Sequence, residues 1–94
     1  MEKSADKTII TVVGKDTVGI IAKVCTYLSE NGINILDISQ TIVDGFFNMM
    51  MIANTELSSK KFMEISEDLE ALGKEIHCII RVQREDIFDR MHRI

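Results

Sequence analysis

Short apolar runs alternate with amphipathic segments along the chain, and Gly and Asn residues separate them. Lys7 to Val13 is rich in β-branched residues and ends at Gly14, which predicts a buried strand. Its nearly continuous apolar character is typical of a central strand. A helix is expected to begin near Val18 and to end at Asn31-Gly32, because apolar residues recur at helical spacing at Ile21, Val24, Cys25 and Leu28.

The middle of the chain predicts a hairpin of two strands. The first strand runs from Ile33 to Val43, and its apolar parity changes near Ile35-Leu36, which indicates either a β-bulge or a region buried on both sides. Asp44-Gly45 is a hairpin turn signal, so Phe46 to Ala53 is expected to return antiparallel. The returning segment has apolar residues on both parities, which indicates that a second layer or a partner covers each face.

The last third predicts a helix, a strand and a tail. Gly73 is expected to end the helix, whose apolar residues are Phe62, Ile65, Leu69 and Leu72. Apolar residues then alternate from Ile76 to Gln83, which predicts a half-buried strand. The tail, residues 85–94, is predicted to be a short amphipathic helix docked on the body or on a second subunit, with its apolar stripe formed by Ile87, Phe88, Met91 and Ile94.

The order βαββαβ predicts an α+β, ferredoxin-like domain over residues 7–84, followed by the tail. We expect a four-stranded antiparallel sheet in the order 4-1-3-2, with both helices on one face. This order places residues 33–43 at an edge, where a long apolar strand favours aggregation unless it is paired. The sequence therefore predicts a homodimer that pairs this edge strand with its copy.

Composition narrows the range of functions. The chain has 94 residues, as one domain does, and a net charge of −4 without a basic patch, so no nucleic-acid partner is expected. No apolar stretch approaches the ~20 residues of a membrane span, and the N-terminus has no apolar core, so we expect a cytoplasmic protein without a membrane partner. Cys25 and Cys78 both lie in apolar patterns and are predicted to be reduced thiols.

Several chemistries lack the residues that they require. Metal carriage would need a pair of Cys in the first loop, and His77 and His92 have no partner at ligand spacing, so neither a metal nor a cofactor is expected. Phe46 and Phe47 have no Lys or Arg beside them, which favours packing over stacking on RNA bases. An acylphosphatase-like enzyme would need an Arg in the first loop, which offers only Lys15.

The loop between the first strand and the first helix is the remaining candidate site. Asp16 or Thr17 can cap the helix, and Gly19 in its first turn lets another group approach the backbone. The exposed amides and the positive end of the helix dipole can receive a carboxylate. An ordinary strand-to-helix turn has the same pattern, so both interpretations remain open.

The segment from Val13 to Val24 resembles the opening motif of ACT domains, and Asn31 to Ile35 resembles the start of that family's second strand. The resemblance spans all four strands. It is closest to the short, free-standing ACT proteins of bacteria and archaea, and it extends to the ACT units of a glycine-cleavage transcriptional repressor. The family motif Asp-x-Pro-Gly-x-Leu reads here as Asp16-Thr17-Val18-Gly19-Ile20-Ile21, so that a valine replaces the proline that fixes the first helical turn.

The resemblance implies a ligand site shared by two chains. In the family, the edge strands pair, and an amino acid or another small metabolite binds between the first loop of one chain and the second strand of the other. Carried over, the site comprises Gly14, Lys15, Asp16, Thr17, Val18, Gly19 and Ile20 in the loop and Asn34, Ile35 and Leu36 in the facing strand. Main-chain amides near Val18 and Gly19 would hold a carboxylate, and Asn34 would either bind a polar ligand group or serve the turn after Gly32.

These observations favour a regulatory ACT module that binds an amino acid as a homodimer and has no catalytic activity. It would act alone or on a separate regulated protein, such as an enzyme or a regulator. Two alternatives remain. One is a ligand-free interaction module, based on the amphipathic tail and the two-sided apolar strands. The other is a small acylphosphatase-like enzyme that handles phosphate.

Overall fold

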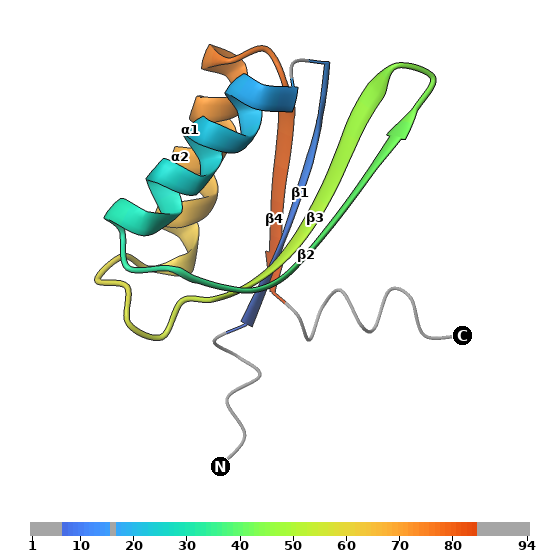
Figure 1. Ribbon diagram of the computed structural model, residues 1–94. Helices are drawn as coiled ribbons and strands as arrows, with labels where there is room; N and C mark the ends of the chain where they lie inside the picture. The colour runs from blue at the N-terminus through green and yellow to red at the C-terminus, as the bar shows by residue number, and fades with distance from the viewer. Residues whose placement is uncertain (1–6, 16, 85–94) are drawn as a thin grey trace.

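The computed structural model describes residues 7–15 and 17–84, and the predicted tail helix lies outside them. The described residues form four strands and two helices in the expected order (Figure 1). These elements are β1 (Lys7–Gly14), α1 (Thr17–Glu30), β2 (Asn34–Val43), β3 (Phe46–Asn54), α2 (Phe62–Glu75) and β4 (Ile79–Arg84). The sheet order β2-β3-β1-β4 confirms the predicted ferredoxin-like topology, and both helices cover the same face.

The central position predicted for the first strand is confirmed. β1 pairs antiparallel with β3 on one side and with β4 on the other. Ile9, Ile10 and Val12 are all buried. Burial at neighbouring positions, which point to opposite faces of the sheet, accounts for the nearly continuous apolar run in this segment.

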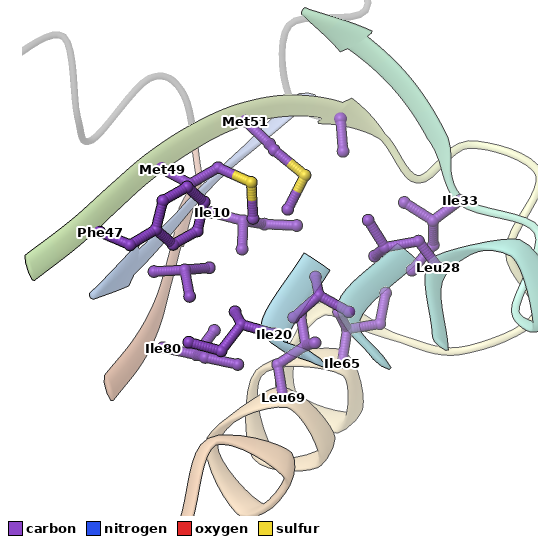
Figure 2. Close-up of a cluster of buried hydrophobic side chains, with 13 residues drawn as sticks. Ile10, Ile20, Leu28, Ile33, Phe47, Met49, Met51, Ile65, Leu69 and Ile80 are labelled. Carbon is purple, nitrogen blue, oxygen red and sulfur yellow. The ribbon is translucent and has the colours of Figure 1, made fainter. Parts of the chain in front are cut away.

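The core lies between the helices and one face of the sheet. Ile20, Val24 and Leu28 follow one another at intervals of four residues along α1, and Ile65 and Leu69 have the same spacing on α2. Figure 2 shows Ile20, Ile65 and Leu69 facing residues of the sheet, namely Ile10, Phe47, Met49 and Met51, and Leu28 beside Ile33. Because each fully buried side chain of this kind contributes roughly 1.5–3 kcal/mol, the helix stripes hold the two layers together.

Both helices end in the same hydrogen-bonded arrangement, a Schellman motif. After α1, the amide of Ile33 donates to Leu28 O at 2.9 Å and Gly32 has a φ of +69°, which confirms the predicted end. After α2, the amide of Cys78 donates to Gly73 O at 2.8 Å, and His77 occupies the left-handed position with a φ of +61°. A side chain in this region costs roughly 1–2 kcal/mol relative to glycine, so α2 ends at a strained residue.

The prediction that Gly73 ends the second helix was wrong, since α2 continues through it to Glu75. A β-carbon at Gly73 would lie 2.8 Å from Cys78 O and 3.2 Å from Ile80 Cγ1. The glycine therefore lets α2 approach β4 closely and does not terminate the helix. Because residues 76–78 form the helix cap and the turn after it, β4 begins at Ile79 and not at Ile76 as expected.

The predicted hairpin is confirmed, and its first strand contains a bulge. Asp44 and Gly45 have φ values of +53° and +81°, as a two-residue type I′ turn requires. The register of β2 against β3 shifts between Ile35 and Asp37, which leaves Leu36 as the extra residue of the bulge. This shift explains the change of apolar parity in the sequence.

The end of the hairpin extends beyond the helix layer. A helix of 14 residues is about 21 Å long, whereas a strand of ten residues spans about 33 Å. Figure 1 shows the β2–β3 hairpin leaning away from the helices, and every residue of β2 except Ile35 is exposed. Ile42 and Val43 near the turn are 70% and 57% exposed, so an apolar edge remains uncovered within one chain.

A polar cluster joins the two helices on their outer side. The hydroxyl of Tyr27 on α1 donates to Asp68 Oδ2 on α2 at 2.7 Å, and Lys60 Nζ lies 2.6 Å from the same oxygen. Lys60 Nζ also lies 5.5 Å from the centroid of the Tyr27 ring. Burial, and next the hydrogen bond to Asp68, raises the pKa of Tyr27, so the hydroxyl remains protonated and continues to donate.

The contact at Gly73 can be tested with Gly73→Ala. Alanine should favour an isolated helix by about 1 kcal/mol, whereas the clash with the Cys78 carbonyl should cost about 1–3 kcal/mol. We expect a net loss of up to about 2 kcal/mol in urea unfolding. Glu75→Ala, at an exposed position of the same helix, is the control and should change stability by less than about 0.5 kcal/mol. If alanine at position 73 stabilised the protein, the close approach would be refuted.

The polar cluster predicts a pH-dependent contribution to stability. The hydrogen bond from Lys60, and next that from Tyr27, lowers the pKa of Asp68 below its ordinary value of 3.8. A carboxyl group of this kind stabilises the fold above its unfolded pKa, and the stabilisation is lost as the pH falls through the lower folded pKa. We therefore expect Asp68→Asn to be less stable than the wild type at pH 7, with the difference closing below about pH 4.

Thermal unfolding measured from pH 2 to pH 7 checks this expectation. The exposed neighbour Glu67→Gln is the matched control, because it removes one carboxylate from the same helix without touching the cluster. A stability difference between wild type and Asp68→Asn that stayed constant over the whole range would show that the carboxylate contributes nothing through its charge.

Candidate ligand site

The first loop begins at a glycine with a clear packing role. A β-carbon on Gly14 would lie 2.5 Å from Ile20 Cδ1 and 2.7 Å from Cys78 Cβ. The end of β1 is therefore in close contact with the start of α1 and with the connection between α2 and β4. Gly14 is buried, so the first residue of the candidate site is fixed by packing against the core.

The other loop residues differ widely in their access to solvent. Lys15 is exposed, and its Nζ lies 5.3 Å from the centroid of the Phe46 ring. Val18 in the first turn of α1 is 79% exposed, Gly19 is half-buried, and Ile20 belongs to the core. A ligand reaching the start of α1 would therefore meet Val18 first. Asp16 and the side chain of Thr17 lie outside the described part of the chain, so their predicted capping role stays a prediction.

The second half of the predicted site lies at the far end of α1. Asn34 is exposed, Ile35 is half-buried, and Leu36 is 45% exposed. Asn34 and Ile35 line a shallow pocket of about 440 Å³ with residues from the end of α1, namely Cys25, Leu28 and Ser29. The length of α1, about 21 Å, separates this pocket from the first loop. Within one chain, the two halves of the predicted site are not brought together.

A further pocket, of about 310 Å³, involves residues that the sequence did not point to as a site. It joins the first loop at Gly14 and Lys15 to Lys74 and His77 at the end of α2. In the sequence, His77 is only a histidine a few residues after a helical segment. That pattern does not predict a pocket, because the turn that places His77 beside the first loop is visible only in the structure. Cys78 also lines this pocket, and burial raises the pKa of its thiol, which keeps it protonated and weakly nucleophilic.

Another groove lies between the two helices and contains none of the predicted site residues. It has a volume of about 570 Å³ and includes Tyr27 and Asp68, whose side chains already bond to each other. In residues 7–15 and 17–84, no three His, Cys, Asp or Glu side chains are grouped so that they could hold a metal ion. Neither of the described helices has the length and apolar character needed to cross a membrane.

Residues 7–83 match the ACT domain family, and this match covers the four strands and both helices except for the last residue of β4. The chain belongs to the ACT domain family. A UPF0237 protein of Bifidobacterium longum is 61% identical over 89 residues, which cover 95% of this chain and 99% of that protein. A UPF0237 protein of Methanocaldococcus jannaschii is 42% identical, with coverage of 94% and 98%.

Solved structures agree with this assignment. An ACT domain protein from Streptococcus pneumoniae superposes with a TM-score of 0.78 at 41% identity, covering 88% of this chain and 93% of that one. A protein described as a glycine cleavage system transcriptional repressor has a TM-score of 0.75 at 15% identity, which shows a common fold; the match covers 88% of this chain and 48% of that protein. The resemblance inferred from Val13 to Val24 is confirmed. The ACT family comprises regulatory modules that typically bind ligands.

Proposed function

We propose that this ACT chain is a regulatory module that binds an amino acid or a similar small metabolite between two copies and has no catalytic activity of its own. The observation that supports the proposal most directly is the separation of the first loop from Asn34, together with the uncovered edge of β2. Two copies paired through β2 would close the edge and reunite the two halves of the site.

The sheet register supports this assembly. Gly14 pairs with Phe47, and Phe47 pairs with Ile42, so the first loop lies at the same end of the sheet as the end of β2. A two-fold axis perpendicular to the sheet would pair β2 with its copy in antiparallel orientation. The start of the partner's strand would then lie beside the end of β2, which brings Asn34 of the partner subunit toward the first loop.

The exposed apolar residues of β2 also fit a paired edge. Leu36, Ile38 and Ile42 are between 39% and 70% exposed in one chain. A strand with this composition and unpaired backbone groups is a template for pairing with another chain. Pairing with a second copy would bury these residues and add main-chain hydrogen bonds.

The proposed ligand carries a carboxylate and a polar group. Backbone amides at the start of α1 and the positive end of its dipole favour an anion there. The Asn34 side chain is exposed and can both donate and accept hydrogen bonds. The raised pKa of the Cys78 thiol is the opposite of what an activated nucleophile needs, which favours binding over catalysis. The protein that responds to the ligand would be a separate enzyme or regulator.

Ile42→Asp tests the assembly. A carboxylate at position 42 would lie against the start of the partner's β2 and would lose its contact with water there, so we expect the dissociation constant of the dimer to rise at least about 100-fold. Sedimentation equilibrium of wild type and variant measures this change. Leu57→Asp is the matched control, because Leu57 is 86% exposed and lies in the loop before α2; this variant should remain dimeric. A monomeric wild type at micromolar concentration would refute the assembly.

Asn34→Ala tests the ligand. Thermal unfolding of the wild type against an amino-acid panel should single out one compound, because binding to the native state adds about 2.7 kcal/mol at ~100 times its dissociation constant. Asn34→Ala should bind that compound about tenfold more weakly, which corresponds to a loss of about 1.4 kcal/mol. Asn48→Ala, within β3, is the control and should keep the affinity. If no amino acid shifted the unfolding of a dimeric wild type, the amino-acid assignment would fail.

A further inference from the structure

Three segments that are distant in sequence meet at the end of the sheet where β1 finishes. They are the end of β1 with the first loop, the start of β3, and the connection from α2 to β4. The pocket between them has a volume of about 310 Å³, at the small end of the range for ligand sites. Its lining consists of Val13, Gly14, Lys15, Phe46, Gly73, Lys74, His77, Cys78 and Ile79.

The charged side chains around this pocket are all basic. Lys15, Lys74 and His77 line it, and no Asp or Glu does. This lining opposes the composition of the chain, which has 15 acidic residues against 11 Lys and Arg. Within the described ranges, neither lysine forms an ion pair with a carboxylate. Both ammonium groups therefore remain available to an anion.

The left-handed backbone conformation of His77 suggests that its side chain takes part in binding. α1 and α2 end in the same Schellman motif, and α1 places Gly32 at the left-handed position where α2 places His77. Glycine would be less strained at position 77, because the left-handed region disfavours a β-carbon. Strained residues of this kind cluster at binding sites, where the side chain compensates for the strain.

The remaining wall of the pocket is apolar and accessible. Phe46 is 44% exposed and Ile79 is 60% exposed. Lys15 Nζ lies 5.3 Å from the centroid of the Phe46 ring, so a cation and an aromatic surface adjoin at the mouth. A ligand that fits this wall has an anionic group for the basic side chains and an apolar or aromatic group for Phe46 and Ile79.

We infer that this pocket is a second ligand site, built within one chain, for a small phosphate monoester with an apolar or aromatic group. Two lysines match the two negative charges of a phosphate monoester, and the His77 imidazole adds a group that can form a hydrogen bond. Hydrogen bonds between ionised groups are about twice as strong as neutral ones. This phosphate site is different from the proposed amino-acid site. The two share Gly14 and Lys15, but Lys74 and His77 belong only to the phosphate site, which needs no partner chain.

Phenyl phosphate is the probe, and its binding is measured by calorimetry on the full chain. We expect saturable binding below about 10 mM, and at least tenfold weaker binding of benzoate, which has a single charge, and of uncharged phenol. Lys74→Gln should weaken the binding of phenyl phosphate about tenfold. Lys23→Gln is the matched control, because it removes a lysine on α1 that does not line the pocket, and it should leave the affinity unchanged.

His77→Gly separates binding from folding. Because glycine relieves the left-handed strain, the variant should unfold about 4 °C or more above the wild type, yet bind phenyl phosphate at least fivefold more weakly. A loss of affinity in a more stable protein cannot be attributed to misfolding. Unchanged affinity in both His77→Gly and Lys74→Gln, or the absence of saturable binding by the wild type, would overturn the inference.

Two further variants keep this test independent of the proposed function. Asn34→Ala and Ile42→Asp should both leave phenyl phosphate binding unchanged, because neither residue lines the pocket. Binding that disappeared with Ile42→Asp would contradict a site built within one chain. Binding that persisted while no amino acid bound to the wild type would support the phosphate site and refute only the amino-acid site.

Discussion

The part of the sheet that the helices cover depends on a difference in length between the helices and the strands. Each helix has 14 residues and is about 21 Å long, whereas β2 has ten residues and spans about 33 Å. The helices can therefore bury only part of one face of the sheet. Their stripes cover β1 and the inward side of β3 through Val24, Ile65 and Leu69, and the edge strand remains outside this layer. The apolar side chains near the end of β2 are therefore left uncovered within one chain.

The antiparallel topology places the first loop and the basic pocket at the same end of the sheet, opposite the end where Asn34 lies. The hairpin turn and the connection from α2 to β4 lie at the same end as the first loop, as Figure 1 shows. Gly14 is packed closely against Cys78 there, so the backbone at the start of the loop is held in place. The side chains of Lys15 and Phe46 beside it are exposed. Rigid backbone under accessible side chains is the combination that a binding site requires, because the site is ordered before the ligand arrives.

Most of the fold could be predicted from the sequence because its signals are local. β-branched runs, helical spacing and Asp44-Gly45 are each read within a few residues. The parity change near Leu36 left a bulge and two-sided burial open, and the register of β2 against β3 shows the bulge. Gly73 was misread because its role is not local. It makes room for the carbonyl of Cys78, and contact between α2 and β4 cannot be seen in the sequence of either element. The first loop was a candidate from its own residues, and Asn34 was added from the family resemblance. Lys74 and His77 were missed because only the folded turn brings them beside Lys15.

The two helix ends show why residue type alone is an incomplete guide to function. Gly32 and His77 occupy equivalent left-handed positions in the same hydrogen-bonded motif, yet only the glycine is the residue that stability favours there. The end of α1 at Gly32 adjoins the predicted amino-acid half-site at Asn34, where backbone geometry is needed to start β2. The end of α2 adjoins a pocket lined by two lysines, where an imidazole adds a group that a glycine lacks. Strain retained at one of two otherwise equivalent positions indicates that the side chain, and not the turn, is needed at the end of α2.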